Sequence, residues 1–190
     1  MRRLLEAGVE VLAAKGYHAA RVDDVVRAAS TSHGTFYRYF ANKDDLFRAL
    51  LVEVGEAMGE HAESLGPLTA DDAGREELRR WLVGFARLYD RFAPVVRAWV
   101  EAEMDTDQFG RVGADVLAGF AGILTERIEA ADGPVDDPAS AAIVVVAMIE
   151  RANYYAAVGH LAIDPEPLAD SLAAAVHAAL FGISTPRVSH

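Results

Sequence analysis

The sequence predicts an all-α protein, and three observations support this prediction. Apolar residues recur at helical spacing along most of the 190 residues, and no segment keeps the alternation of apolar and polar residues that is typical of a strand. An aspartate stands directly before a proline at Asp137-Pro138 and at Asp164-Pro165, a pattern typical of helix starts. With 52% hydrophobic and 25% charged residues, the composition is that of a globular protein.

The first predicted helix covers residues 3–15. Leu5, Val9 and Leu12 are spaced to form one apolar face of this helix. Gly16 follows at the position where helices commonly end with a residue in the left-handed region.

Two short helices are predicted next, over residues 22–29 and 33–40. The first has a single apolar stripe, which consists of Val22, Val25, Val26 and Ala29. On the second, Phe36 and Phe40 are four residues apart and are expected to pack against that stripe. Two short helices joined by a turn of about three residues predict a helix-turn-helix.

The rest of the chain predicts longer helices with recognisable starts. They cover residues 43–64, 70–92, 94–104, 107–131, 138–160 and 165–181. Their predicted start signals are Asn42, Thr69, Pro94, Asp137 and Asp164. We place the domain boundary near residue 50, which gives a helix-turn-helix domain over residues 1–50 and a larger helical domain over residues 51–190.

Charge is distributed unevenly between these two parts. The chain has a net charge of −11, and an acidic surface is repelled by nucleic-acid phosphates. Residues 1–50 nevertheless carry eight basic and six acidic side chains, so their net charge is +2 and that of the other 140 residues is −13. The N-terminal part is therefore the one that can approach an anion.

The third predicted helix also presents polar groups away from its phenylalanines. His33 with Tyr37, and Thr35 with Tyr39, are each four residues apart on other faces of the helix. Imidazole and hydroxyl groups on an outer face suit base edges and phosphates. The alternative is that the whole aromatic cluster simply forms core.

Residues 16–46 resemble the TetR family of bacterial repressors. The resemblance lies in Gly16-Tyr17, in residues 22–29 (VDDVVRAA), in residues 32–40 (SHGTFYRYF) and in residues 42–46 (NKDDL). It implies that the third helix lies in the major groove of a near-palindromic operator in double-stranded DNA. It further implies that Ser32, His33 and Thr35 read bases, and that Tyr37, Tyr39 and Lys43 hold phosphates.

Two basic residues also have a physical reason to bind phosphate. Lys43 stands at a helix N-terminus, where backbone N–H groups already favour an anion. Arg21 lies just before a helix, although a solvated surface arginine is an equal alternative. The sequence departs from the family at Ser30-Thr31, where glycine and an aliphatic residue are usual, and at Ala41, where proline is frequent.

For the C-terminal part, the resemblance implies a ligand-binding and dimerisation domain. The candidate contacts of a small-molecule effector are its large side chains and one polar residue: Trp81, Phe85, Trp99, Met104, Phe109, Phe120, Asn153 and Tyr154. For each of them, ordinary core is the alternative. Asn153 stands within an apolar helix, where a buried amide needs a partner that a ligand could supply.

A homodimer is predicted from two apolar helices near the C-terminus. The helix over residues 138–160 has an apolar surface that includes Ile143 and Val144 and is too wide for one face of a helix in a monomeric bundle. The last helix adds a stripe formed by Leu168, Leu172, Val176 and Leu180. The alternative is that both helices pack entirely within one subunit.

Other function classes receive little support from the sequence. There is no cysteine, and no metalloprotease motif, phosphate-binding glycine-rich loop or nucleophile elbow is present, so no enzyme, cofactor or metal site is predicted. His61, His160 and His177 are scattered and expected at the surface. Residues 141–149 are too short an apolar run to span a membrane, and a cytoplasmic location is expected. The remaining alternative to a ligand-responsive repressor is a binding module whose helix-turn-helix no longer binds DNA.

Overall fold

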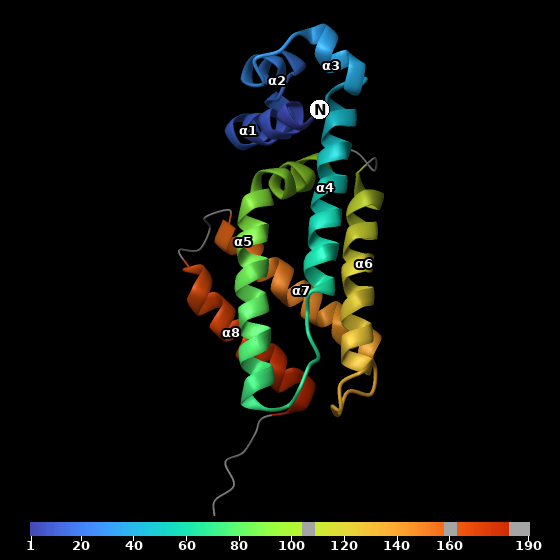
Figure 1. Ribbon diagram of the computed structural model, residues 1–190, viewed down its shortest axis with the longest axis vertical. Helices are drawn as coiled ribbons and strands as arrows, with labels where there is room; N and C mark the ends of the chain where they lie inside the picture. Colours follow the sequence, from blue (N-terminus) through green and yellow to red (C-terminus); the bar gives the residue numbers. More distant parts are fainter. Residues whose placement is uncertain (104–108, 158–162, 183–190) are drawn as a thin grey trace, which may run out of the picture. The chain divides into compact units, whose positions relative to one another are not determined.

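The computed structural model of this chain describes residues 1–103, 109–157 and 163–182, and every regular element in them is an α-helix. Figure 1 shows these helices in chain order. They are α1 (Arg2–Ala19), α2 (Val22–Ala28), α3 (His33–Tyr39), α4 (Lys43–Glu63), α5 (Asp72–Glu103), α6 (Gly110–Glu129), α7 (Pro138–Ala157) and α8 (Pro165–Phe181). The predicted all-α fold class is confirmed.

Contacts along the backbone group the chain into two compact units. Unit 1 comprises residues 1–58 and 91–116, and unit 2 comprises residues 59–90 and 117–190. The borders between them fall inside helices α4, α5 and α6. The domain boundary predicted near residue 50 separates a DNA-binding part from a ligand-binding part, whereas these units are defined by compactness, so that boundary stays a prediction.

Helix α1 continues for one turn beyond its predicted end. Gly16, with φ 70° and ψ 178°, interrupts the helical geometry, but residues 17–19 resume it. The residues that the helix buries are Leu4, Ala7, Gly8, Val11, Leu12 and Tyr17. Of the predicted face, only Leu12 is among them, because the buried stripe starts at Leu4 rather than at Leu5.

Helices α2 and α3 pack against each other, as a helix-turn-helix requires. Val25 and Val26 are buried on α2, and Phe36 is 0% exposed on α3. The Phe36 ring lies 5.7 Å from the ring of Phe40, which is also buried. The predicted core of this motif is confirmed at Val25, Val26, Ala29, Phe36 and Phe40, whereas Val22 is half-buried.

Helix α5 corrects two predictions. The helices predicted over residues 70–92 and 94–104 are one helix, with Pro94 inside it. Proline removes one backbone donor, but Phe92, Ala93 and Val95 are buried around it, and such packing can hold a helix together across the lost hydrogen bond. The residue that caps the start is Asp71 rather than Thr69: its Oδ1 accepts hydrogen bonds from Gly74 N (2.9 Å) and from Thr69 Oγ1 (2.7 Å). These two bonds lower the pKa of the Asp71 carboxyl.

Helices α7 and α8 begin where the Asp-Pro pairs predict. Asp137 accepts hydrogen bonds from the backbone N–H and the hydroxyl of Ser140, at 3.1 and 2.6 Å. On α8, Leu172, Val176 and Leu180 are buried within the single chain, so the prediction that this stripe lies at an interface is wrong. Within the described residues, none of the helices has both the length and the apolar composition needed to cross a membrane.

Candidate nucleic-acid interface

The turn between α2 and α3 is closed by backbone hydrogen bonds that place Ser30 in the left-handed region. Ser30 N donates to Arg27 O (3.1 Å) and Thr31 N donates to Val26 O (2.9 Å), a pair of bonds that commonly ends helices. Ser30 has φ 49°, a conformation that glycine adopts most easily. The departure from glycine at this position therefore changes the residue but keeps the turn.

Ser32 begins the next helix, α3. Its Oγ accepts a hydrogen bond from Thr35 N (3.2 Å) and lies 3.1 Å from Thr35 Oγ1. This side chain therefore satisfies an N-terminal donor of the helix. Of the predicted base-reading residues, Ser32 is the one whose hydroxyl already has a structural task.

Helix α3 separates its aromatic residues between two faces. Phe36 and Phe40 are buried, whereas Tyr37 and Tyr39 are 57% and 44% exposed. The ring of Tyr37 stands edge-on to Phe36, with ring centroids 5.4 Å apart, and Phe36 therefore holds it from the core side. The helix thus carries phenol groups on its outside that a ligand outside the protein can reach.

His33, the first residue of α3, has two neighbours in the structure. Its Nε2 lies 2.6 Å from Oδ1 of Asp23 on α2, and its ring is stacked on that of Tyr37 at a centroid distance of 6.5 Å. The sequence analysis did not predict this contact. The ten-residue separation carries no helical signal, because the turn between the two helices decides which side chains meet.

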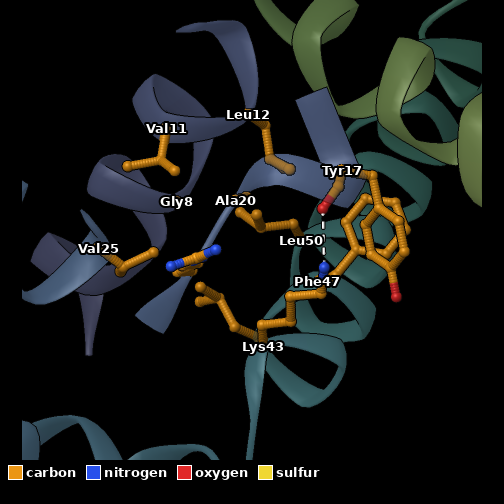
Figure 2. A pocket seen from close by; sticks show the side chains of 11 residues that line it. Gly8, Val11, Leu12, Tyr17, Ala20, Val25, Lys43, Phe47 and Leu50 are labelled. Carbon is orange, nitrogen blue, oxygen red and sulfur yellow. Dashed lines mark hydrogen bonds between the residues drawn. The ribbon is translucent and has the colours of Figure 1, made fainter. Parts of the chain in front are cut away.

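Figure 2 shows the Lys43 side chain extending to the backbone of Tyr17. Its Nζ donates a hydrogen bond to the carbonyl oxygen of Tyr17 (2.8 Å) and lies 4.4 Å from the centre of the Tyr17 ring. Together with Leu12 and Leu50, these residues line a cavity of about 20 Å³, which has room for one water molecule. An ammonium has three N–H donors, so Lys43 keeps donors for an anion.

Tyr17 is held by hydrogen bonds from both its hydroxyl and its backbone N–H. Its hydroxyl donates to Asp44 Oδ1 (2.7 Å), and its backbone N–H donates to Glu101 Oε2 (2.9 Å) on α5. Burial, followed by the contact with the Asp44 carboxylate, raises the pKa of the Tyr17 phenol.

Phe109 is 0% exposed and packs on the Tyr17 ring, with ring centroids 5.6 Å apart. Phe109 therefore belongs to unit 1, although the sequence grouped it with the effector contacts.

Arg21 stands at the start of α2, where its backbone N–H donates to Asp24 Oδ2 (3.2 Å) while its side chain is exposed. Asp24 also accepts hydrogen bonds from Lys15 (2.7 Å) and Arg27 (3.3 Å). The hydrogen bond from Lys15 is the main reason why the pKa of Asp24 is lowered. Asp24 therefore ties α1 to α2, while Arg21, exposed to solvent, also lines the cavity beside Lys43.

The predicted effector contacts do not form one group. Trp81, Phe85 and Phe120 meet in unit 2, with ring centroids 5.5 to 6.0 Å apart, and all three are buried. Trp99 lies in unit 1, where its Nε1 donates to Phe109 O (3.2 Å). Met104 lies outside the described residues.

The two predicted contacts on α7 have partners within the protein. Asn153 is buried, and its Nδ2 donates to Ile149 O (2.8 Å), so this amide already has an acceptor. Tyr154 lies beneath the Arg151 guanidinium, which is 4.9 Å from the ring centre. The neighbouring Glu150 accepts a hydrogen bond from the hydroxyl of Tyr89 (3.0 Å), and burial raises the pKa of that phenol.

Of the histidines that were expected at the surface, His61 is half-buried and His177 is buried in unit 2. The His61 ring is stacked on Trp81 at 4.9 Å, its Nε2 is 3.1 Å from Trp81 O, and burial lowers its pKa. His177 is 8% exposed, with its Nε2 3.1 Å from Thr69 O. His160 lies outside the described residues. Helical periodicity places these residues on a helix, but only packing shows that each one finds a backbone carbonyl.

An apolar groove runs between α6 and α7 in unit 2, with a volume of about 740 Å³. Leu117, Ala121 and Gly122 line it from α6, and Ile143 and Ala147 line it from α7. The sequence analysis missed this groove because its small residues carry no strong apolar signal. Across residues 1–103, 109–157 and 163–182, no group of three or more His, Asp or Glu side chains could hold a metal ion.

Comparison with known proteins shows what this chain is similar to. Residues 4–50 match the family model described as bacterial regulatory proteins, tetR family. The fatty acid metabolism regulator protein of Bacillus subtilis is 26% identical over 136 residues, which cover 68% of this chain and 69% of that protein. The transcriptional regulator AcuR of Cereibacter sphaeroides is 46% identical over 48 residues, which cover 25% of this chain and 22% of that protein.

Solved structures share the fold over nearly the whole chain. The regulator FadR from Bacillus subtilis in complex with stearoyl-CoA aligns with a TM-score of 0.72 at 20% identity, over 96% of this chain and 98% of that one. The regulatory protein TetR from Rhodobacter sphaeroides aligns with a TM-score of 0.72 at 24% identity, over 94% of this chain and 97% of that one.

Proposed function

We propose that this chain, whose residues 4–50 match the tetR family model, is a TetR-family DNA-binding repressor that a small-molecule effector releases from its operator. The observation that carries the proposal is the division of α3 between buried and exposed aromatic residues. Phe36 and Phe40 anchor the helix, while Tyr37 and Tyr39 stand at its exposed side. A helix held in this way can enter the major groove without losing its core.

Each exposed group on α3 is assigned a role by its chemistry. Thr35 and His33, near the N-terminus of the helix, read base edges, because the first turn of a recognition helix lies deepest in the groove. Tyr37 and Tyr39 donate hydrogen bonds to phosphates. Ser32 contributes mainly as the cap of the helix, and its hydroxyl has donor capacity left for DNA.

Lys43 and Arg21 are the proposed cationic phosphate contacts. Lys43 is the first residue of α4, and its ammonium is held by the Tyr17 carbonyl, so it adds a fixed charge beside the N-terminal N–H groups of that helix. The Arg21 side chain is exposed at the start of α2. Both contacts would bind any sequence and would make affinity depend on salt.

A mobility-shift titration tests the proposal directly. Duplexes are selected by the protein from a random-sequence pool, and their affinity is measured across a range of salt concentrations. The expected result is enrichment of a near-palindromic site whose affinity falls steeply with salt. Recovery of no enriched sequence, with equal weak binding to all duplexes, would reject a DNA-binding repressor in favour of a module that has lost this function.

We propose that the repressor is a homodimer that uses the exposed side of α7. Ile143 and Val144 are 62% and 63% exposed, and Ile143 also lines the apolar groove beside α6. Isologous contact of this surface with a second copy would cover it, and a two-fold dimer presents two recognition helices about 34 to 36 Å apart. Light scattering should therefore report a dimer for the wild type and a monomer for Val144→Asp, with Glu126→Gln, an exposed change on α6, as control. A Val144→Asp variant that stays dimeric would exclude this surface.

The proposed effector class is a long-chain acyl thioester. This proposal is supported by the likeness to FadR from Bacillus subtilis, whose structure contains stearoyl-CoA, and by the buried aromatic cluster of Trp81, Phe85 and Phe120. An apolar chain would be accommodated by rearranging such a cluster, and the resulting coupling to DNA is typically worth about 1 to 3 kcal/mol. Trp99, in unit 1, is not expected to touch the effector.

The two tryptophans allow this to be measured. In a Trp99→Phe variant, Trp81 becomes the single fluorescent indole, because the chain has two tryptophans. Stearoyl-CoA, but not coenzyme A alone, should change this fluorescence and release the selected duplex. A matched Trp81→Phe variant should show no fluorescence response. Release of DNA without any change at Trp81 would place the effector elsewhere.

A further inference from the structure

We propose that Asp23 is a positioning residue for His33 and thereby a determinant of which base α3 recognises. The proposal rests on the proposed DNA-binding function and deepens it. The two side chains come from different helices, α2 and α3, and their Nε2 and Oδ1 atoms are 2.6 Å apart. The pair forms part of the surface that carries the exposed tyrosines.

The contact does little for the fold. The side chains of His33 and Asp23 are 56% and 66% exposed, and exposed pairs contribute little to stability because solvent screens them. The task of tying α1 to α2 belongs to the neighbouring Asp24, which accepts hydrogen bonds from Lys15 and Arg27. Asp23 is therefore available for a task other than stability.

The contact fixes the orientation of the imidazole. A carboxylate accepts hydrogen bonds, so Nε2 must carry the proton that it shares with Asp23. The face of the ring is stacked on Tyr37, with planes 26° apart. With one edge and one face held, Nδ1 is the ring nitrogen left to meet a base edge, as an acceptor in the neutral ring and as a donor in the charged ring.

A carboxylate on this surface also has an electrostatic cost for DNA binding. Phosphates repel it at every sequence, and a base contact by His33 can offset that repulsion only at the correct site. Asp23 thus lowers the affinity for all DNA, and the base contact that it gives His33 recovers this affinity only at the correct site. Removal of its charge should strengthen binding to unrelated DNA while it weakens discrimination.

The test compares Asp23→Ala, which removes both the charge and the hydrogen-bond acceptor, with the wild type on the selected duplex, on its single-base variants and on unrelated DNA. We expect Asp23→Ala to bind unrelated DNA several-fold more tightly and to lose about tenfold in discrimination at one base position. Glu10→Gln removes the same charge from an exposed position on α1 and should leave discrimination unchanged. Thermal unfolding of each variant should remain within the range of the wild type.

A double-mutant comparison shows whether Asp23 acts through His33. In a His33→Ala background, Asp23→Ala should have no further effect on discrimination, because there is no ring left to hold. An equal loss in both backgrounds would show that Asp23 contacts a base itself and would overturn the proposal, as would unchanged discrimination in Asp23→Ala. If the wild type selects no sequence at all, the proposed DNA-binding function fails first. If the wild type selects a sequence and Asp23→Ala reads it equally well, only the present proposal fails.

Discussion

Helix α3 of unit 1 and the core of unit 2 treat their polar groups in opposite ways. In unit 1, α3 buries Phe36 and leaves its phenols at an exposed surface. In unit 2, the polar atoms of His61, Asn153 and His177 lie within hydrogen-bonding distance of backbone carbonyls of the same chain. A surface that must bind a partner keeps hydrogen-bonding groups available, whereas a core must satisfy them internally. This difference is why the sequence points to a DNA site in unit 1 more clearly than to an effector site in unit 2.

The largest expected effect separates the two faces of α3. Phe36→Ala removes a side chain that is 0% exposed and should cost about 3 to 5 kcal/mol of unfolding free energy in a urea titration. Tyr37→Ala, the next residue, is 57% exposed and should change stability by less than about 0.5 kcal/mol while it weakens DNA binding. Equal destabilisation by both variants would contradict the division of the helix into two faces.

Substitution by alanine should change stability in opposite directions at Gly16 and Gly119. Gly16→Ala should destabilise the chain by about 1 to 3 kcal/mol, because φ 70° with ψ 178° is strained for any side chain, and because its Cβ would lie 2.7 Å from Glu101 Oε2. Gly119→Ala in α6 meets no atom within 4 Å and should stabilise by about 0.5 to 1 kcal/mol. The two melting temperatures should therefore move in opposite directions. A stabilising Gly16→Ala would show that the interruption in α1 is not required.

The contacts proposed for DNA separate into two kinds in binding titrations. Thr35→Ala should change preference at particular bases by about 1 to 3 kcal/mol. Tyr39→Ala and Lys43→Ala should weaken binding to all sequences, and the slope of log affinity against log salt should fall by about one for Lys43→Ala. Unchanged affinity in all three variants would reject the assignment of faces on α3.

The smallest expected effect concerns pH and lies in unit 2. Burial lowers the pKa of His61 from the ordinary value of 6.5, so the unfolded chain takes up a proton first as the pH falls through this value. The free energy of unfolding should therefore decrease as the pH falls below about 6.5, and the stability lost should return as the pH rises. His61→Phe keeps a ring on Trp81 and should flatten this part of the pH dependence. An identical pH dependence in both proteins would assign it to other groups.

Local sequence patterns predicted most of the helices and the aromatic core of the helix-turn-helix. Val25, Val26, Phe36 and Phe40 are buried as their spacing predicts, because helical periodicity is a local property that short segments already carry. Caps at Asn42 and Asp137 were predictable for the same reason, since a cap binds atoms within the next few residues.

The packing of the helices determines which side chains far apart in the sequence come into contact. The pairing of Asp23 with His33, the Lys43 ammonium on the Tyr17 carbonyl and the burial of Phe109 in unit 1 join residues that no helical period connects. The same holds for α8, whose apolar stripe was predicted at a dimer interface but is buried within the single chain. Periodicity shows that a helix has an apolar side, but the packing of the other helices determines what covers it.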